Sequence, residues 1–173
     1  MGRAPVRVGI LGLGSMGRHH VRNARATPGF EVVALADPAG DPHGVAGPLE
    51  VLPDVHALIR AGIDAAIVAA PTVHHEEAAL ALARAGVHAL VEKPLAASAA
   101  AGALIRDAFC AAGLVGAVGY VERCNPALIE MRRRIADGQL GQIYQIATRR
   151  QSPFPARICD VGVVKDLATH DVD

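Results

Sequence analysis

A glycine-rich turn between a strand-like and a helix-like segment is the feature that most constrains this chain. An apolar strand is predicted over Val6 to Leu11, and GLGSMG follows at residues 12–17, opening a helix over Ser15 to Thr27. A second apolar strand, Glu31 to Asp37, ends in an acid about 20 residues after the last glycine. With 18 glycines in the chain, a GxGxxG spacing alone is weak. Its place between these elements predicts a dinucleotide-binding βαβ unit.

Each part of the turn has its own physical purpose. Gly12 permits the tight turn, Gly14 lets the backbone approach a diphosphate, and Gly17 lets the helix pack closely on the strand. The N–H groups of the first helical turn, beginning at Ser15 and Met16, then face the anion. The alternative is that the glycines serve strand–helix packing alone.

Asp37 predicts which dinucleotide is bound. Its carboxylate can accept hydrogen bonds from the adenosine ribose, whereas a 2′-phosphate there meets a like charge. At ~5 Å and an effective dielectric constant of ~20, that repulsion is on the order of 3 kcal/mol per unit charge before solvent screening. The next residues, PAGD at 38–41, supply no cation. We therefore predict NAD rather than NADP, the alternative being a solvated acid at a strand end.

Strands and helices continue to alternate up to residue 121. The remaining predicted strands are apolar on both faces and helices lie between them, which indicates a doubly wound parallel α/β sheet with helices on both sides. Residues 38–53 read as a loop. The further predicted strands are Asp64–Ala70, Val87–Glu92 and Leu114–Val121, and the helices are Val55–Ala61, His75–Ala85 and one that Ser98 caps and Gly113 ends.

The pattern changes after Asn125-Pro126. We predict an amphipathic helix over Pro126–Ala136, a strand over Gln142–Arg150 and a helix over Asp160–Asp173. These elements are too few for an independent sheet. We therefore expect a Rossmann domain over residues 1–122, and in residues 123–173 the start of an incomplete α/β second domain.

Composition excludes several classes of protein. The 17 basic and 17 acidic side chains cancel, and aromatic residues are only 3%, which argues against nucleic-acid binding. The chain has no signal-like start, and its apolar runs fall short of the ~20 residues that cross a bilayer. The three cysteines form no CxxC pair, so we expect buried, reduced thiols in a cytoplasmic protein.

Further candidate residues follow the third and fourth strands, where ligands bind in an open parallel sheet. The first group is Pro71, Thr72 and His75, and the second is Glu92 and Lys93. For Lys93 the alternative is a surface lysine, and for His75 a residue that only supports the turn. Near the end of the chain, Asp166 and His170 stand four apart on one predicted helical face, as an acid–base pair or an ordinary surface pair. No spacing fixes a metal geometry, so we predict no metal site.

Several stretches together resemble the Gfo/Idh/MocA family of NAD(P)-dependent oxidoreductases. They are GLGSMG, ALADP, APTVHH, EKPLA, GYVERCNP and DVGVVKDLATHDVD, in this order. The EKP triplet and the late DxxxH make the resemblance specific. It implies oxidation of a sugar or cyclitol hydroxyl to a ketone, or the reverse reaction, and the last stretch is most similar to the branch that acts on the 3-hydroxyl of UDP-N-acetyl sugars.

The resemblance also implies roles for individual residues. Lys93 would contact substrate and nicotinamide ribose, and His170 would be the general base with Asp166 as its partner. The nicotinamide half would be lined by Glu92, Pro71, Thr72 and His75. Arg123 and Asn125 would lie near the cofactor and the substrate, and Lys165 would bind the substrate.

Members of this family are about twice as long, which leaves two functions open. The first is a dehydrogenase that acts as a homo-oligomer on a sugar or nucleotide sugar. The second is a non-catalytic NAD-binding module or truncated remnant. A methyltransferase that binds S-adenosylmethionine at the glycine turn would not explain the EKP triplet.

Overall fold

The computed structural model describes residues 4–149 and 168–172 of the chain. The chain divides into two compact units, Met1–Val118 and Gly119–Asp173. All strands found among the described residues belong to the first unit. No described helix is both long and apolar enough to cross a membrane.

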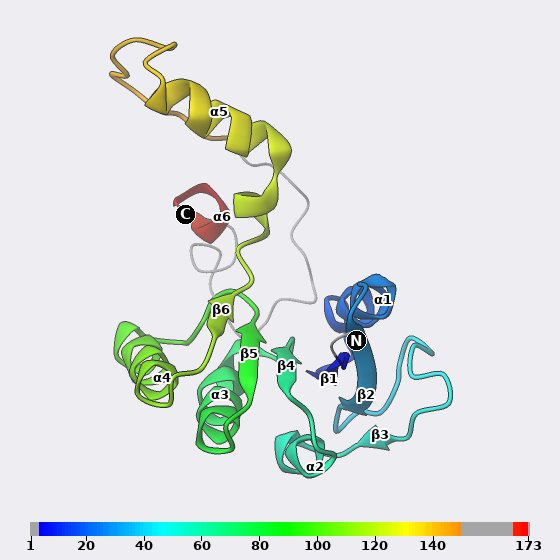
Figure 1. Ribbon diagram of the computed structural model, residues 1–173. Helices are drawn as coiled ribbons and strands as arrows, with labels where there is room; N and C mark the ends of the chain where they lie inside the picture. Colours follow the sequence, from blue (N-terminus) through cyan, green and yellow to red (C-terminus); the bar gives the residue numbers. More distant parts are fainter. Residues whose placement is uncertain (1–3, 150–167, 173) are drawn as a thin grey trace. The chain divides into compact units, whose positions relative to one another are not determined.

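The first unit is built on one six-stranded sheet with the order β3-β2-β1-β4-β5-β6 (Figure 1). Every neighbouring pair is parallel, and the order reverses between β1 and β4. This is the arrangement of a doubly wound dinucleotide-binding sheet, so the predicted Rossmann fold is confirmed. The strands are β1 (Val6–Leu11), β2 (Phe30–Ala36), β3 (Val51–Leu52), β4 (Ala65–Val68), β5 (His88–Val91) and β6 (Gly116–Val118).

Helices cover both faces of the sheet, because side chains alternate between the faces along each strand. Val8 and Ile10 of β1 share a buried cluster with Val21 of the helix α1. The next residue, Leu11, belongs to a second buried cluster, which holds Leu82 and other side chains of the remaining helices. The helices of this unit are α1 (Gly17–Ala26), α2 (Val55–Arg60), α3 (His75–Arg84) and α4 (Ala99–Ala111).

Local signals fix the two ends of α4 where the sequence predicts them. The Ser98 hydroxyl oxygen accepts the N–H of Ala101 at 3.2 Å, which satisfies a donor of the first turn. Gly113 follows the helix with a φ of +64°, a left-handed conformation that favours glycine. The predicted cap and end of this helix are therefore confirmed.

Two segments of the first unit differ from the prediction. Residues 38–53, expected as a loop, contain β3, which pairs with the end of β2. The strand expected over Leu114–Val121 is only Gly116–Val118, because its partner β5 ends at Val91, which is paired with Val118. A strand without a partner has no ladder to continue, and the chain instead turns into the 3-10 helix η2 (Val121–Cys124).

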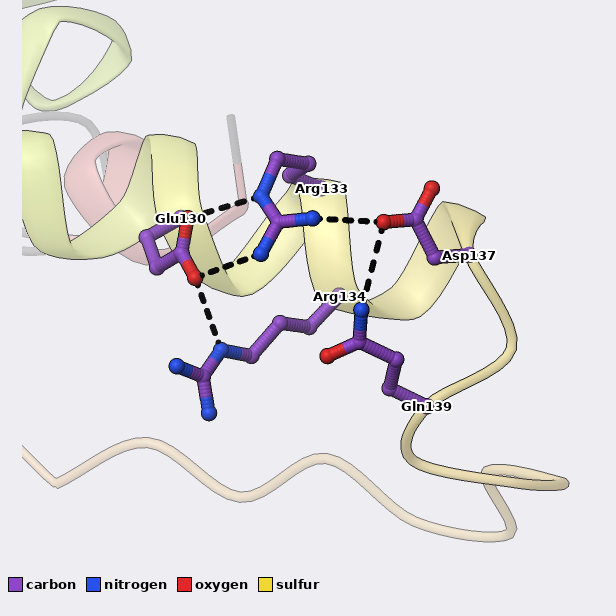
Figure 2. Close-up of polar contacts among 5 residues, drawn as sticks. All are labelled: Glu130, Arg133, Arg134, Asp137 and Gln139. Atoms are coloured by element: carbon purple, nitrogen blue, oxygen red, sulfur yellow. Dashed lines mark hydrogen bonds and ion pairs between the residues drawn. The ribbon is translucent and has the colours of Figure 1, made fainter.

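The second unit contains the predicted amphipathic helix as α5 (Pro126–Ala136), with the expected bounds. Charged side chains on this helix and just after it form a network of ion pairs and hydrogen bonds (Figure 2). Arg133 and Arg134 both donate to Glu130, and Arg133 also reaches Asp137. The two guanidinium groups lower the pKa of Glu130 to about 2, and Glu130 in turn raises the pKa of Arg133.

The other predictions for the second unit were only partly met. The strand expected over Gln142–Arg150 is wrong for residues 142–149, which form no strand. These residues form no strand because they have no partner to pair with, since no strand exists among the described residues of this unit. Of the helix expected over Asp160–Asp173, the described part contains α6 (Thr169–Val172).

The cysteines also depart from expectation. Cys110 and Cys124 are free thiols but exposed, so the prediction of buried thiols is wrong for both. Cys110 lies on α4 beside the stripe that faces the core, which consists of Ala101, Ile105 and Phe109. Cys159 lies outside the described residues.

Candidate functional site

The carboxyl ends of neighbouring strands lie level at one edge of the sheet. Leu11 of β1 is paired with Ala36 of β2 and with Val68 of β4, and Val68 is paired with Val91 of β5. The loops that follow therefore start side by side, at Gly12, Asp37, Ala69 and Glu92. In a sheet of this order, ligands bind at this edge near the reversal between β1 and β4.

Three glycines shape the turn after β1 in different ways. Gly12 has a φ of +91°, and a Cβ there would lie 2.6 Å from the backbone of Ala69. A Cβ on Gly17 would lie 1.9 Å from the carbonyl oxygen of Gly12. A Cβ on Gly14 would meet nothing within 4 Å. Packing therefore requires glycine at positions 12 and 17, whereas Gly14 borders open space.

That open space fits the diphosphate of a dinucleotide. Ser15 and Met16 are exposed and lead into α1. The first N–H groups of a helix have no partner within it and carry the positive end of the helix dipole. A diphosphate beside Gly14 would meet these donors with no side chain between. The residues of the turn would thus hold the diphosphate of NAD.

Asp37 lies directly after β2, beside this turn. One carboxylate oxygen accepts the N–H of Leu13 at 2.7 Å, and the other accepts the N–H of Ala39 at 2.8 Å. Each oxygen keeps a second lone pair, which suits the hydroxyl groups of the adenosine ribose. The carboxylate is therefore fixed in place and available, as the NAD prediction requires.

The loop after Asp37 is held by residues that sequence reasoning missed. The Asp41 carboxylate accepts the N–H groups of Val45 and Ala46, and these bonds lower its pKa. Arg25, near the end of α1, donates to the carbonyl oxygens of the same two residues at 2.7 Å. No spacing rule links Arg25 to this loop, so only the structure reveals the pairing.

The loop after β4 carries Pro71, Thr72 and His75, at the 3-10 helix η1 (Thr72–His74) and the start of α3. Pro71 is exposed, Thr72 is buried, and His75 is only 1% exposed. The His75 Nε2 lies 2.8 Å from the carbonyl oxygen of Ala70, and its Nδ1 lies 2.9 Å from that of Pro94. The imidazole therefore connects the loops that follow β4 and β5.

The loop after β5 carries Glu92 and Lys93. Glu92 is buried, and its backbone N–H continues the ladder to the carbonyl oxygen of Val68 at 2.9 Å. Its carboxylate lies 2.7 Å from the Nε2 of His20, on α1, and also accepts the N–H of Lys93 at 3.1 Å. Lys93 is half-buried. His20 was not predicted, since nothing in its spacing distinguishes it from other helical histidines.

The second unit carries the remaining candidates. The Arg123 guanidinium stands 5.2 Å from the centre of the Tyr120 ring, a cation–π distance. Asn125 caps α5 by accepting the N–H of Ala127, and its amide donates to Glu122. His170 is half-buried in α6. Lys165 and Asp166 lie outside the described residues.

A family model describing oxidoreductases with an NAD-binding Rossmann fold, GFO_IDH_MocA, matches residues 6–120. Inositol 2-dehydrogenase 2 of Saccharopolyspora erythraea and scyllo-inositol 2-dehydrogenase (NAD(+)) of Bacillus subtilis are both 33% identical to the chain. Each alignment covers 97% of this chain and 52% of the relative. The chain thus spans about half the length of these curated relatives.

UDP-N-acetylglucosamine 3-dehydrogenase of Acidithiobacillus ferrooxidans is similar in both sequence and structure. It is 31% identical over 97% of this chain and 52% of its own length. Its solved structure superposes with a TM-score of 0.76, at 28% identity, over 98% of this chain and 55% of that chain. Relatives named as inositol dehydrogenases and one named as a UDP-N-acetylglucosamine dehydrogenase are thus all similar to this chain.

Proposed function

Since the chain belongs to the Gfo/Idh/MocA oxidoreductase family, we propose that it acts as an NAD-dependent dehydrogenase. Its substrate would be a hydroxyl group of a cyclic polyol or a sugar. The observation that carries the proposal is the level edge of the sheet. There the diphosphate turn, the ribose-binding Asp37 and the Glu92–Lys93 pair follow β1, β2 and β5.

Lys93 has the chemistry that a hydride transfer needs. As the hydride leaves the carbinol carbon, negative charge develops on the hydroxyl oxygen, and an ammonium group nearby stabilises it. The chain's 17 basic residues are 15 arginines and two lysines, Lys93 and Lys165. Lysine carries its charge as a compact ammonium on a flexible stem, which suits the stabilisation of a single oxyanion at position 93.

The remaining roles in the proposal rest on the family resemblance. When bound, NAD would supply the nicotinamide ring as the hydride acceptor for the oxidation of the alcohol to a ketone. His170 takes the proton of the substrate hydroxyl, with Asp166 orienting it. Pro71, Thr72 and Glu92 line the nicotinamide half, and Arg123, Asn125 and Lys165 contact the substrate.

The proposed substrate class is a ring with adjacent secondary hydroxyl groups, either free, as in an inositol, or carried on a nucleotide. The two inositol dehydrogenases named above are slightly more similar to this chain than the UDP-N-acetylglucosamine enzyme, at 33% against 31% identity. We therefore rank inositols first and the 3-hydroxyl of a UDP-N-acetyl sugar second.

The experiment incubates the chain with NAD and, separately, scyllo-inositol, myo-inositol or UDP-N-acetylglucosamine, and follows the absorbance of NADH. Lys93→Ala should lower the rate at least about 100-fold, and Arg106→Ala, which removes an exposed cation on α4, should not change it. Cofactor binding without turnover of any substrate would instead support a non-catalytic NAD-binding module.

A further inference from the structure

The buried carboxylate of Glu92 has two partners that lie far apart in the sequence. Its side chain is 8% exposed, and a buried acid is stable only when its oxygens are hydrogen-bonded. Oε1 lies 2.7 Å from the Nε2 of His20, and Oε2 lies 3.1 Å from the N–H of Lys93. The carboxylate thus joins α1 to the backbone of Lys93.

The direction of the first bond follows from the chemistry of the acid. An ionised carboxylate can only accept, so the Nε2 of His20 carries the proton and donates it. The bond is charge-assisted, which makes it stronger and shorter than a neutral one. The His20 side chain is 16% exposed, so few waters can take its place.

The position of His20 places this bond next to the predicted cofactor-binding turn. His20 lies in the first turn of α1, the helix that opens at Gly17 with the diphosphate turn. Glu92 lies across the sheet edge, after β5. A shift of α1 around a bound diphosphate would therefore be transmitted to Glu92, and from Glu92 to the backbone of Lys93.

We propose that His20 is a positioning residue, which holds Glu92 so that the backbone, and with it the ammonium, of Lys93 is aimed at the reacting hydroxyl. The proposal rests on the proposed function of Lys93. Misplacing a reacting group by about 1 Å can reduce a rate up to ~100-fold. Loss of the His20 donor should therefore lower turnover about 10- to 100-fold and leave the NADH affinity within about threefold.

The chain offers a direct probe of Lys93, because it contains only two lysines. Reductive methylation with ¹³C-formaldehyde gives one signal for each lysine and one for the terminal amine, and Lys165→Arg assigns them. Spectra without NADH are compared for the unchanged chain, His20→Gln, which keeps an N–H donor, and His20→Met, which has none. His56→Met, an exposed histidine on α2, is the control. Turnover is measured on the unlabelled proteins.

We expect His20→Met to move the Lys93 signal and lower turnover, and His20→Gln to restore both most of the way. A Lys93 signal and a turnover that are unchanged in His20→Met would overturn the proposal. If His20→Met does not fold, Glu92→Gln takes its place as the test. We expect Glu92→Gln to move the Lys93 signal in the direction expected for His20→Met, and an unmoved signal would contradict the proposal. If NADH leaves the Lys93 signal of the unchanged chain in place, the proposed function fails, and the spectra without NADH still decide the role of His20.

Discussion

Replacing Gly14 by alanine should separate stability from cofactor binding. A Cβ at this position meets no atom within 4 Å, and its φ is not in the left-handed region, so the folded chain accommodates it. Alanine also restricts the unfolded chain, which stabilises a protein by about 0.4–1 kcal/mol at a compatible site. For a chain of this size we expect the melting temperature to stay level or rise by up to about 3 °C.

The same methyl group occupies the space assigned to the diphosphate. Moving the anion away from the turn weakens at least one charge-assisted hydrogen bond, worth about 1.5–3 kcal/mol. The affinity for NADH should therefore fall roughly 10- to 150-fold. Gly17→Ala is the matched comparison, because its Cβ would lie 1.9 Å from the Gly12 carbonyl oxygen. It should lower both the affinity and the melting temperature.

The assays are thermal unfolding by circular dichroism and titration with NADH followed by its fluorescence. If Gly14→Ala binds NADH as tightly as the unchanged chain, the diphosphate does not lie beside Gly14. If Gly14→Ala melts as low as Gly17→Ala, the open space beside Gly14 does not exist.

Three further predictions concern Asp37, His75 and Glu130. Asp37→Ala should reduce the preference for NADH over NADPH at least tenfold, which fluorescence titration with both cofactors measures; an unchanged preference would contradict the role of Asp37. The same change should destabilise the fold by about 1–3 kcal/mol in urea unfolding, since the N–H of Leu13 loses its acceptor. His75→Phe, which keeps a ring but no donor, should destabilise the fold by about 1–3 kcal/mol, because the one N–H of a neutral imidazole is lost to whichever carbonyl group, that of Ala70 or that of Pro94, accepts it. An unchanged urea midpoint would argue against this hydrogen bond. Glu130 should titrate near pH 2 in a ¹³C NMR experiment. The pKa of Glu130 in the folded chain is below its usual 4.5, so its ion pairs stabilise the folded state fully above about pH 4.5, and this stabilisation is lost as the pH falls to about 2. A titration midpoint near 4.5 would show that the ion pairs do not form.

The sequence predicts the first unit well because its signals are local. Apolar runs, the glycine turn and the Ser98 cap each act within a few residues, and the structure confirms them. The length of β6 could not be predicted, because it depends on where β5 ends. The same holds for residues 142–149, where an apolar pattern without a partner strand produces no strand.

In the candidate site, too, residues of a local motif could be predicted, and contacts between distant residues could not. Gly12, Gly14, Gly17 and Asp37 belong to one local motif, so their placement at a common edge could be expected. The contact between His20 and Glu92 joins residues that are 72 positions apart, and the Arg25 contacts with the loop after β2 depend on how α1 packs. Such contacts are set by tertiary structure, which no periodicity in the chain records.

The most direct test of the whole account is a titration of the ¹⁵N-labelled chain with NADH, followed at the backbone amides. We expect the largest shifts on residues 12–17, on Asp37 and on Glu92–Lys93, and we expect NADPH to produce them only at concentrations at least about tenfold higher. If the amides at this edge of the sheet do not move at millimolar NADH, the cofactor does not bind there.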